Sequence, residues 1–475
     1  MYQEATICAL SSPVGTGGVA VIRVSGPEAF SICEKLIKGT KLSALSSHKA
    51  ILRKIRDPKN GELLDEALVL PMKGPGTFTG EDTVEIDCHG GMYLCRRILE
   101  ALIASGCHMA APGEFTRRAF MNGRMDLTEA EAVMDMIDAG TRYSLKAASS
   151  QMEGRLFKEA NALRDGLIRM LADIEVNIDY PEYDDLPEIT ETEIQDKTKE
   201  ILDKVEELLE SADTGMLLRD GLKVSLIGLP NVGKSSLLNR LLKEERAIVT
   251  DIPGTTRDVI SEKMDLGGIP LKLLDTAGIR ETEDVVENIG VERSFKAIRE
   301  SDLVLLLIEP VAQLSAFPGV EPLSSDEIRL IESEEDKPYL ILVNKIDQLA
   351  SPEEAVSHVK AVLSSREDLP KPLAVLPISA QTGEGIDTLE ETIKEAFFNR
   401  DLLEKDAPMV TNLRQKEALI RAKEALLRVC AGAGLPEDLL TIDLTEAADA
   451  IGDLIGKSAR DDVIENIFSR FCLGK

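Results

Sequence analysis

The residues whose types and spacing could do the clearest chemistry lie between Gly228 and Ser235, in the segment GLPNVGKS. This segment matches the pattern G-x-x-x-x-G-K-[ST] and stands between the apolar run LKVSLI and the helix-forming run SLLNRLL. Its glycines let backbone N–H groups approach phosphate oxygens, and the following helix adds the positive end of its dipole. In this pattern Lys234 reaches the β- and γ-phosphates and Ser235 ligates Mg²⁺. The segment predicts a site for a nucleoside triphosphate.

Two later segments would read the base. Asn344, Lys345 and Asp347 follow the apolar run LILV, and the Asp347 carboxylate can accept hydrogen bonds from the ring N–H and the exocyclic amine of guanine. Adenine presents no such pair of donors, so this segment favours GTP over ATP. The segment PISAQTG adds Ser379 and Ala380, whose backbone can contact the guanine carbonyl. Elements in this order, each after a strand, are typical of a GTP site.

A fourth segment, DTAG, covers Asp275 to Gly278 and follows the run LKLL. There the Asp275 carboxylate can support Mg²⁺ and the Gly278 N–H can meet the γ-phosphate. In Ras, a glutamine soon after this glycine helps to orient the attacking water. Here Ile279 and Arg280 follow instead. These four segments therefore predict GTP binding but leave open which group positions the water.

Four regions would position these residues. Residues 1–120 alternate apolar and polar runs with glycine and proline turns, which predicts strands mixed with short helices. Residues 121–220 are helical in pattern, and residues 221–398 alternate strands with helices, as in a parallel sheet with crossover helices. Residues 399–475 are helical again. We expect a multidomain α/β protein with an N-terminal α+β domain, an all-α domain built from two segments, and an inserted doubly wound P-loop domain.

Two helix boundaries can be predicted within residues 121–220. The segment DLTEAEAV offers Thr128 as an N-cap with Glu131 three residues later, a capping-box pattern. After the proline-rich acidic stretch DYPEYDDLPEIT, a charged helix is expected from Thr192 to Glu210.

Composition limits the function classes. The seven cysteines are scattered without a C-x-x-C pair, which argues against a disulfide framework or a zinc site and favours a reducing compartment. The longest apolar run, Leu303–Ile308, is too short to cross a bilayer and reads as a buried strand, and the N-terminal sequence is a poor signal peptide. We expect a cytoplasmic protein without a membrane partner. His89 and His108 lack ligand spacing, while Cys472 is open to a redox or a structural interpretation.

The formal net charge is −29, which predicts weak non-specific attraction to nucleic acid. The charge is uneven, because residues 96–124 carry five arginines and a histidine. This basic region could hold RNA or an anionic small molecule, and a solvated surface with scattered charges explains it about equally well.

Other motifs add a family resemblance that covers the whole chain. The segment TDIPGTTRD, Thr250–Asp258, resembles the switch segment of the MnmE (TrmE) family, which are tRNA-modifying GTPases related to translation factors. In the same order as in that family, the chain carries GTGGV, FTGED, PGEFTRRAF, DLTEAEAV and a terminal C-x-G-K.

The resemblance implies what replaces the missing glutamine. In that family a potassium ion lies beside the phosphates, and its ligands correspond to Asn231, Thr250, Ile252 and Thr255. Mg²⁺ would be held by Ser235 and the switch threonine Thr256, and Glu287 would orient the water, so the implied catalytic residues are Glu287, Lys234 and Thr256. The predicted GTP-binding residues are Asn231, Val232, Gly233, Lys234, Ser235, Ser236, Thr250, Asp251, Ile252, Pro253, Gly254, Thr255, Thr256, Asp275, Thr276, Ala277, Gly278, Asn344, Lys345, Asp347, Ser379 and Ala380.

The resemblance also implies a second ligand. The family's N-terminal region is similar to the folate-binding fold of aminomethyltransferases, with matching positions at Arg23, Glu85, Arg124 and Lys475. A carboxylate such as Glu85 can pair with the pterin edge, and cations suit the folate tail. Related proteins can carry lysine where Arg124 stands. The implied cofactors are K⁺, Mg²⁺ and a 5-formyl- or methylene-tetrahydrofolate.

The implied activity is that of a homodimer that joins through its N-terminal domains and works with an FAD-containing MnmG-type protein. Together they would install an aminomethyl-type group at the wobble uridine C5 of certain tRNAs. Two other functions stay open on sequence: a ribosome-assembly GTPase, and a folate-dependent RNA methyltransferase that the GTP-binding domain regulates.

Overall fold

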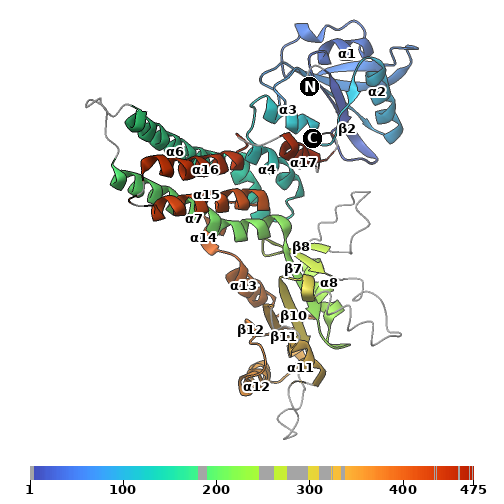
Figure 1. Ribbon diagram of the computed structural model, residues 1–475. Coiled ribbons are helices and arrows are strands. Elements are labelled where there is room, and N and C mark those ends of the chain that lie inside the picture. The colour runs from blue at the N-terminus through green and yellow to red at the C-terminus, as the bar shows by residue number, and fades with distance from the viewer. Residues whose placement is uncertain are drawn as a thin grey trace. The chain divides into compact units, whose positions relative to one another are not determined.

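The computed structural model of the chain (Figure 1) describes residues 5–179, 190–244, 262–274, 298–309, 323, 325–332, 337–432, 434, 436–457, 461–469, 471–472 and 474. The chain forms two compact units, each built from separate stretches of sequence. The first unit comprises Met1–Met134, Met152–Arg169 and Thr445–Lys475, and the second comprises Asp135–Gln151 and Met170–Leu444.

The first unit contains a six-stranded sheet in the order β3-β4-β5-β2-β1-β6, in which only the β1–β6 pair is parallel. Its strands are β1 (Ile7–Leu10), β2 (Gly17–Ser25), β3 (Ile51–Arg56), β4 (Leu63–Met72), β5 (Thr83–Gly90) and β6 (His108–Met109). Side chains alternate between the faces of a strand. Ile22, Val24 and Ile86 therefore share one face, where they pack with α1 (Ala29–Leu36) and α2 (Met92–Ala104). A short 3₁₀ helix, η1 (Leu42–Ala44), lies between α1 and β3.

The opposite face of this sheet carries the polar side chains of β2 and β5. Ile7 and Ala9 on that face pack against Phe115 of α3 (Glu114–Met121). Helix α17 (Asp461–Ser469) packs on α3, with Phe468 next to Phe120 and Phe471. Gly113 at the start of α3 has a left-handed φ of 68°, and a Cβ there would collide with the Phe468 carbonyl oxygen.

Helix α4 (Leu127–Asp138) corrects the predicted N-cap. The Asp126 carboxylate accepts from the backbone N–H of Thr128 (2.7 Å) and Glu129 (3.1 Å), and the Asp126 N–H donates to the Glu129 carboxylate at 2.9 Å. The capping box is therefore Asp126 with Glu129, not Thr128 with Glu131. The earlier start places Leu127 inside the helix, where its side chain is buried.

The helices of the second unit include α5 (Arg142–Met152) and α7 (Glu191–Asp220), and after the inserted domain α14 (Arg400–Glu404) and α15 (Leu413–Ala431). α6 (Arg155–Asp179) and α16 (Glu437–Leu454) contribute to both units. α7 begins with a capping box between Thr190 and Glu193 and ends at Asp220, ten residues beyond the expected end at Glu210, with Gly221 as its C-cap. α7 packs along α15, so segments from both sides of the inserted domain form one all-α domain, as predicted.

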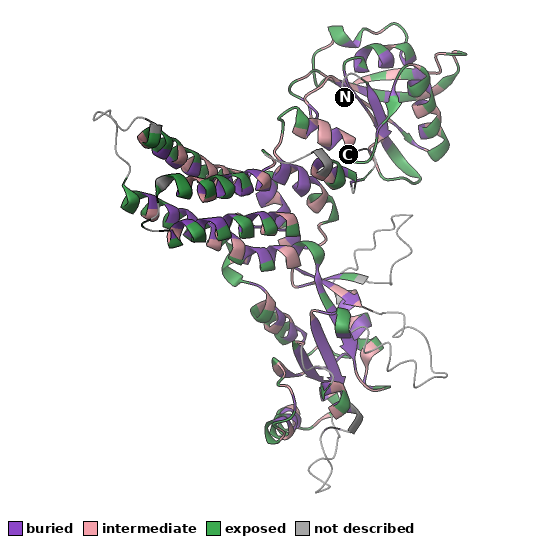
Figure 2. Cartoon of the chain, in the orientation of Figure 1, coloured by how far each residue is buried: buried purple, intermediate pink, exposed green. Residues whose placement is uncertain are grey.

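The inserted domain is doubly wound, as predicted. Its sheet has the order β12-β11-β10-β7-β9-β8 and is parallel except for the β8–β9 pair. The strands are β7 (Leu222–Ile227), β8 (Glu262–Leu266), β9 (Ile269–Leu274), β10 (Leu303–Ile308), β11 (Tyr339–Val343) and β12 (Ala374–Pro377). β10 and β11 are buried along their whole length (Figure 2).

Helices cover both faces of this sheet and enclose two apolar clusters. One cluster includes α8 (Lys234–Glu244) and α13 (Ile386–Phe397), and the other includes α11 (Ser325–Glu332) and α12 (Pro352–Ser365). A 3₁₀ helix, η2 (Ile346–Gln348), follows β11. Among the described helices, none is long and apolar enough to cross a membrane.

Candidate functional site

The predicted phosphate loop lies where β7 meets α8, next to the carboxyl ends of β10 and β11. A Cβ at Gly228, which has a φ of 150°, would collide with the Leu307 carbonyl oxygen of β10. A Cβ at Gly233, with a φ of 104°, would collide with the side-chain nitrogen of Asn344. Glycine is therefore required at both positions, by the backbone of β10 at Gly228 and by the Asn344 side chain at Gly233, and the loop presents backbone at this position.

Lys234 points into this loop. Its ammonium group donates to the carbonyl oxygens of Gly228 and Leu229, both at 2.7 Å, and burial lowers its pKa. Ser235 and Ser236 are exposed in the first turn of α8. Asn231 is exposed and adopts a left-handed φ of 65°, a conformation that asparagine tolerates better than most residues. Val232 is buried.

Asn344 connects the phosphate loop to the predicted guanine loop. Its side-chain nitrogen donates to the Val232 carbonyl oxygen at 2.7 Å, and its side-chain oxygen accepts from the Ala380 N–H at 2.9 Å. The residue is 1% exposed, so both bonds are shielded from water. The structure thus brings together the segments after β7, β11 and β12, as the motifs predict.

The motif predicts a contact from the backbone of Ser379 and Ala380 to the guanine carbonyl, and the Ala380 N–H belongs to that backbone. Because it is donated to Asn344 here, such a contact would require Asn344 to share or release it. Asp347 is exposed, and the Ser379 hydroxyl donates to its Oδ1 at 2.6 Å. The Thr382 N–H in turn donates to the Ser379 hydroxyl at 3.1 Å, which fixes the orientation of that serine.

Two further side-chain contacts hold this region, and the motifs did not reveal them. Lys345 has a left-handed φ of 61°, and its ammonium group pairs with Glu309 at the end of β10 at 2.6 Å. Arg240 of α8 donates to the carbonyl oxygens of Ala380 and Gln381. Both contacts join segments that are distant in sequence, so no local pattern indicates them.

Part of the predicted site lies outside the described residues. These residues are Thr250, Asp251, Ile252, Pro253, Gly254, Thr255, Thr256, Asp275, Thr276, Ala277, Gly278 and Glu287, together with Lys475 of the folate set. Their predicted roles remain predictions.

In the first unit, Arg23 and Glu85 form an ion pair. The residues are directly opposite on β2 and β5, and their side chains meet at 2.8 Å. The Arg23 guanidinium also lies over the rings of Phe78, at 5.5 Å, and Phe115, at 5.7 Å. The pair therefore sits on the face of the sheet that α3 covers, with aromatic rings beside it.

Arg124 contacts the loop that carries Phe78. Its Nε donates to the Thr77 carbonyl oxygen at 2.9 Å, and Gly80, with a left-handed φ of 77°, approaches its side chain closely. Gly474, the neighbour of Lys475, accepts a hydrogen bond from the Ser11 hydroxyl at 3.1 Å, just beyond β1. Three of the four predicted folate residues thus lie in the first unit with known contacts.

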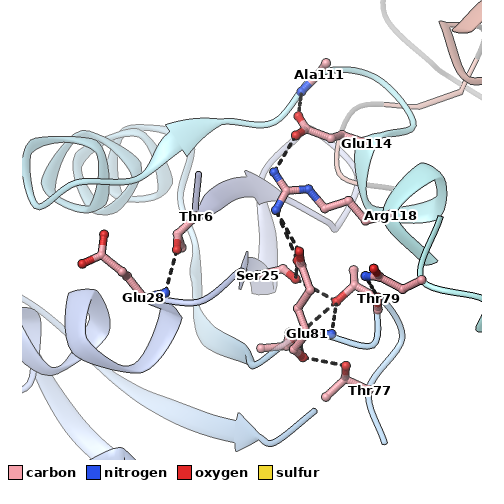
Figure 3. A network of polar contacts seen from close by, with 11 residues as sticks. Thr6, Ser25, Glu28, Thr77, Thr79, Glu81, Ala111, Glu114 and Arg118 are labelled. Carbon is pink, nitrogen blue, oxygen red and sulfur yellow. Dashed lines mark hydrogen bonds and ion pairs between the residues drawn. The ribbon is translucent and has the colours of Figure 1, made fainter. Parts of the chain in front are cut away.

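A polar network holds the Thr77–Glu81 loop in place (Figure 3). The Glu81 carboxylate accepts from the Ser25 hydroxyl at 2.7 Å and from Arg118 at 3.2 Å. Arg118 also donates to Glu114 at 2.8 Å, and Ser25 shares a 2.8 Å hydrogen bond with Thr79. The network joins β2, the Thr77–Glu81 loop and α3. It therefore holds the loop that carries Phe78, whose ring lies next to the Arg23 guanidinium.

The basic region expected at residues 96–124 is largely neutralised. Arg96 pairs with Glu100, Arg97 pairs with Asp57 and Glu62, and Arg118 pairs with Glu81 and Glu114. The carboxylates come mostly from other elements, which the local sequence does not show. At least three of the five arginines are thus paired with carboxylates, which reduces the positive charge available there to attract RNA.

The cysteines form no disulfide, and His89 has a polar partner. All seven cysteines are free; five are buried and Cys472 is exposed. His89 bonds to Asp65 at 2.8 Å. Within the described residues, no group of three or more His, Cys, Asp or Glu side chains could hold a metal ion.

Comparison with known proteins adds to this geometry. A family model described as "GTP-binding protein TrmE N-terminus" matches residues 6–124, and one described as "MnmE helical domain" matches residues 127–472. The protein named tRNA modification GTPase MnmE from Oceanobacillus iheyensis is 44% identical, with 100% of both chains covered. Its namesake from Streptococcus thermophilus is 46% identical, over 99% of this chain and 98% of its own. A solved structure of Era with MgGDPNP and part of 16S ribosomal RNA is 28% identical over 43% of this chain and 66% of its own, with a TM-score of 0.26, too low to compare folds.

Proposed function

Because this chain belongs to the MnmE family of tRNA modification GTPases, we propose that it is activated by potassium and works with a flavin-containing partner on the wobble uridine of certain tRNAs. Membership in this family identifies the chain as a GTP hydrolase that acts in tRNA modification. The structural observation that supports its GTP-binding part is the buried side chain of Asn344, which joins a backbone-lined phosphate loop to the guanine loop, and the potassium and partner roles rest on the family.

The described residues fit a bound GTP with Mg²⁺. The Lys234 ammonium group now binds two neutral carbonyl oxygens, and the β- and γ-phosphates would offer charged acceptors, which form stronger hydrogen bonds. Ser235, in the first turn of α8, would ligate Mg²⁺ together with Thr256. Asp347 would select guanine, since Ser379 already fixes one of its oxygens and the residue is open to solvent.

Potassium would lie beside the phosphates, held by Asn231, Thr250, Ile252 and Thr255. Asn231 fits this role because its side chain is exposed on the phosphate loop, in a left-handed backbone conformation that turns the loop at that residue. When bound, the cation would neutralise charge that develops between the β- and γ-phosphates. Glu287 would orient the attacking water in place of the glutamine of Ras.

A tetrahydrofolate would bind in the first unit. Glu85 would pair with the pterin edge, with Arg23 in an ion pair with that carboxylate and the rings of Phe78 and Phe115 close to the Arg23 guanidinium. Arg124 and Lys475 would face the anionic tail. When bound, the folate would supply a one-carbon unit.

The remaining parts of the proposal concern assembly. The chain would form a homodimer through its N-terminal domains, and its GTP-binding domains would approach each other in the GTP state. The flavin of an MnmG-type partner would supply the oxidation–reduction step of the modification at C5. Similarity over the full length to modification GTPases favours this function over a ribosome-assembly switch or a stand-alone methyltransferase.

Steady-state GTP turnover in potassium chloride and in sodium chloride tests the proposal. We expect faster turnover in potassium, and we expect Asn231→Ala to lose most of that advantage. Asn239→Ala, the same substitution at an exposed position of α8, is the matched control and should keep it. Equal rates of the unmodified protein in the two salts would refute potassium activation.

A further inference from the structure

One segment of the first unit reverses the charge of the chain as a whole. The chain holds 84 acidic against 55 basic residues. Residues 35–59 contain a single carboxylate, Asp57, against the eight basic residues Lys35, Lys38, Lys41, Lys49, Arg53, Lys54, Arg56 and Lys59. We call this segment the basic edge, because its strand, β3, is the outermost strand at one side of the sheet.

The basic edge surrounds a cavity of about 340 Å³. Ile51 and Ile55 of β3 contact the apolar core, and the alternate side chains Leu52, Lys54 and Arg56 point to the other face. The cavity is lined by Ile37, Lys38, Leu52, Arg53, Lys54, Arg56 and Glu66. It therefore wraps around the rim of the sheet, with four cationic side chains and one carboxylate in its wall. Its volume is in the range of small-ligand pockets.

The positive charges here are not neutralised as those of residues 96–124 are. Lys38, Lys41, Lys49, Lys54 and Lys59 are exposed, and within the part of the chain that the structure describes none of them forms an ion pair. The two arginines donate to neutral oxygens: Arg53 to the Thr40 hydroxyl at 2.8 Å, and Arg56 to the Gly61 carbonyl at 3.0 Å. An anion could therefore reach these side chains without displacing a carboxylate.

We propose that the basic edge binds the sugar–phosphate backbone of the RNA substrate. This inference rests on the proposed function, in which the substrate is a tRNA. Lysine is a compact point charge on a flexible stem, and it contacts phosphates without reading bases. Residues 35–59 contain no Phe, Tyr or Trp on which a base could stack. The basic edge therefore contributes affinity and orientation, and other parts of the molecule or its partner must recognise the particular tRNA.

Salt dependence of tRNA binding to the full-length chain tests this inference. Each phosphate contact contributes about −0.7 to −0.9 to the slope of log affinity against log salt concentration. In fluorescence anisotropy with a labelled tRNA, Lys38→Gln/Lys54→Gln/Lys59→Gln should lower the magnitude of the slope by about 2 to 3. The affinity advantage of the unmodified protein should then shrink about 20-fold or more between ~50 and ~200 mM salt.

The matched control removes three charges elsewhere. Lys197→Gln/Lys360→Gln/Lys371→Gln replaces exposed lysines of the second unit, changes the net charge equally, and should keep the slope of the unmodified protein. Urea unfolding of both triple variants checks that the fold is intact, because exposed substitutions of this kind change stability little.

Three results would overturn the inference. One is a slope for the basic-edge variant equal to that of the control. Another is unchanged tRNA binding with an altered oligomeric state in sedimentation, which would assign the edge to an acidic protein surface. The third is failure of the unmodified chain to bind tRNA, and in that case the potassium and folate measurements would still decide the proposed function separately.

Discussion

Replacing Asn344 with alanine would break the link between the phosphate loop and the guanine loop. The substitution leaves the Val232 carbonyl and the Ala380 N–H without their partner in a position that is 1% exposed. An unsatisfied buried backbone group costs about 1–3 kcal/mol, so the two together should cost about 2–4 kcal/mol once some water enters the space. Part of this cost should appear as lower stability and part as weaker nucleotide binding, because both loops surround the same ligand.

The assay pairs urea unfolding with GTP and GDP affinities measured with a fluorescent nucleotide. A loss of about 2 kcal/mol in binding corresponds to roughly a 30-fold weaker affinity. Gln348→Ala, an exposed substitution four residues later, is the control and should leave both quantities nearly unchanged. If Asn344→Ala unfolds like the unmodified protein and binds GTP within about threefold of its affinity, the two buried bonds do not couple the loops and the reasoning is wrong.

Three other outcomes follow from local geometry. Gly233→Ala should weaken GTP binding at least about tenfold, because the added Cβ would collide with Asn344. Gly123 also has a positive φ but open space around it, so Gly123→Ala should bind GTP normally at a stability cost of about 1–2 kcal/mol. Asp126→Ala should lower the free energy of unfolding by about 0.5–2 kcal/mol through loss of the N-cap of α4, and a variant as stable as the unmodified protein in urea would contradict the revised boundary. Glu85→Gln should weaken binding of 5-formyltetrahydrofolate at least about tenfold in calorimetry, since hydrogen bonds to a charged acceptor contribute about 1.5–3 kcal/mol. Glu28→Gln, at an exposed position, should leave the affinity unchanged. Equal affinities of the two variants would remove Glu85 from the folate site.

The sequence predicts most strongly those features that depend on short, ordered patterns. The apolar run Leu303–Ile308 is a buried strand, and the glycines of the phosphate loop have the positive φ values that a close backbone approach requires. The arrangement of two helical segments around an inserted doubly wound domain also follows from periodicity. In each case the residues that carry the signal are close together in the chain, even where the contacts that require them, such as Gly228 with Leu307, are distant.

Errors arose where two local patterns competed or where the partner is distant. Asp126 with Glu129 and Thr128 with Glu131 are overlapping capping boxes, and the burial of Leu127 within the helix accompanies the first. Helix α7 continues past Glu210 because no proline occurs before its C-cap at Gly221. The small residue Gly215 then lets the backbone at Val410 approach, a contact that depends on the tertiary fold.

Long-range pairing explains the features that the motifs missed. The Arg240 contacts to the guanine loop and the carboxylates that neutralise Arg97 come from elements far away in the chain. A count of charges along residues 96–124 could not show that Arg97 is already paired, and a count along residues 35–59 could not show that its exposed lysines form no ion pair with the other described residues.

The contact between Gly113 and Phe468 has a consequence for how the protein is made. About 350 residues separate the two positions, and a ribosome adds roughly 5–20 residues per second. The core next to α3 therefore remains incomplete for roughly 20–70 s, until Phe468 of α17 and Phe471 just beyond it have been synthesised. During synthesis the inserted domain, whose sheet is continuous in sequence, can fold first. We expect the N-terminal unit to mature last, although its residues emerge first.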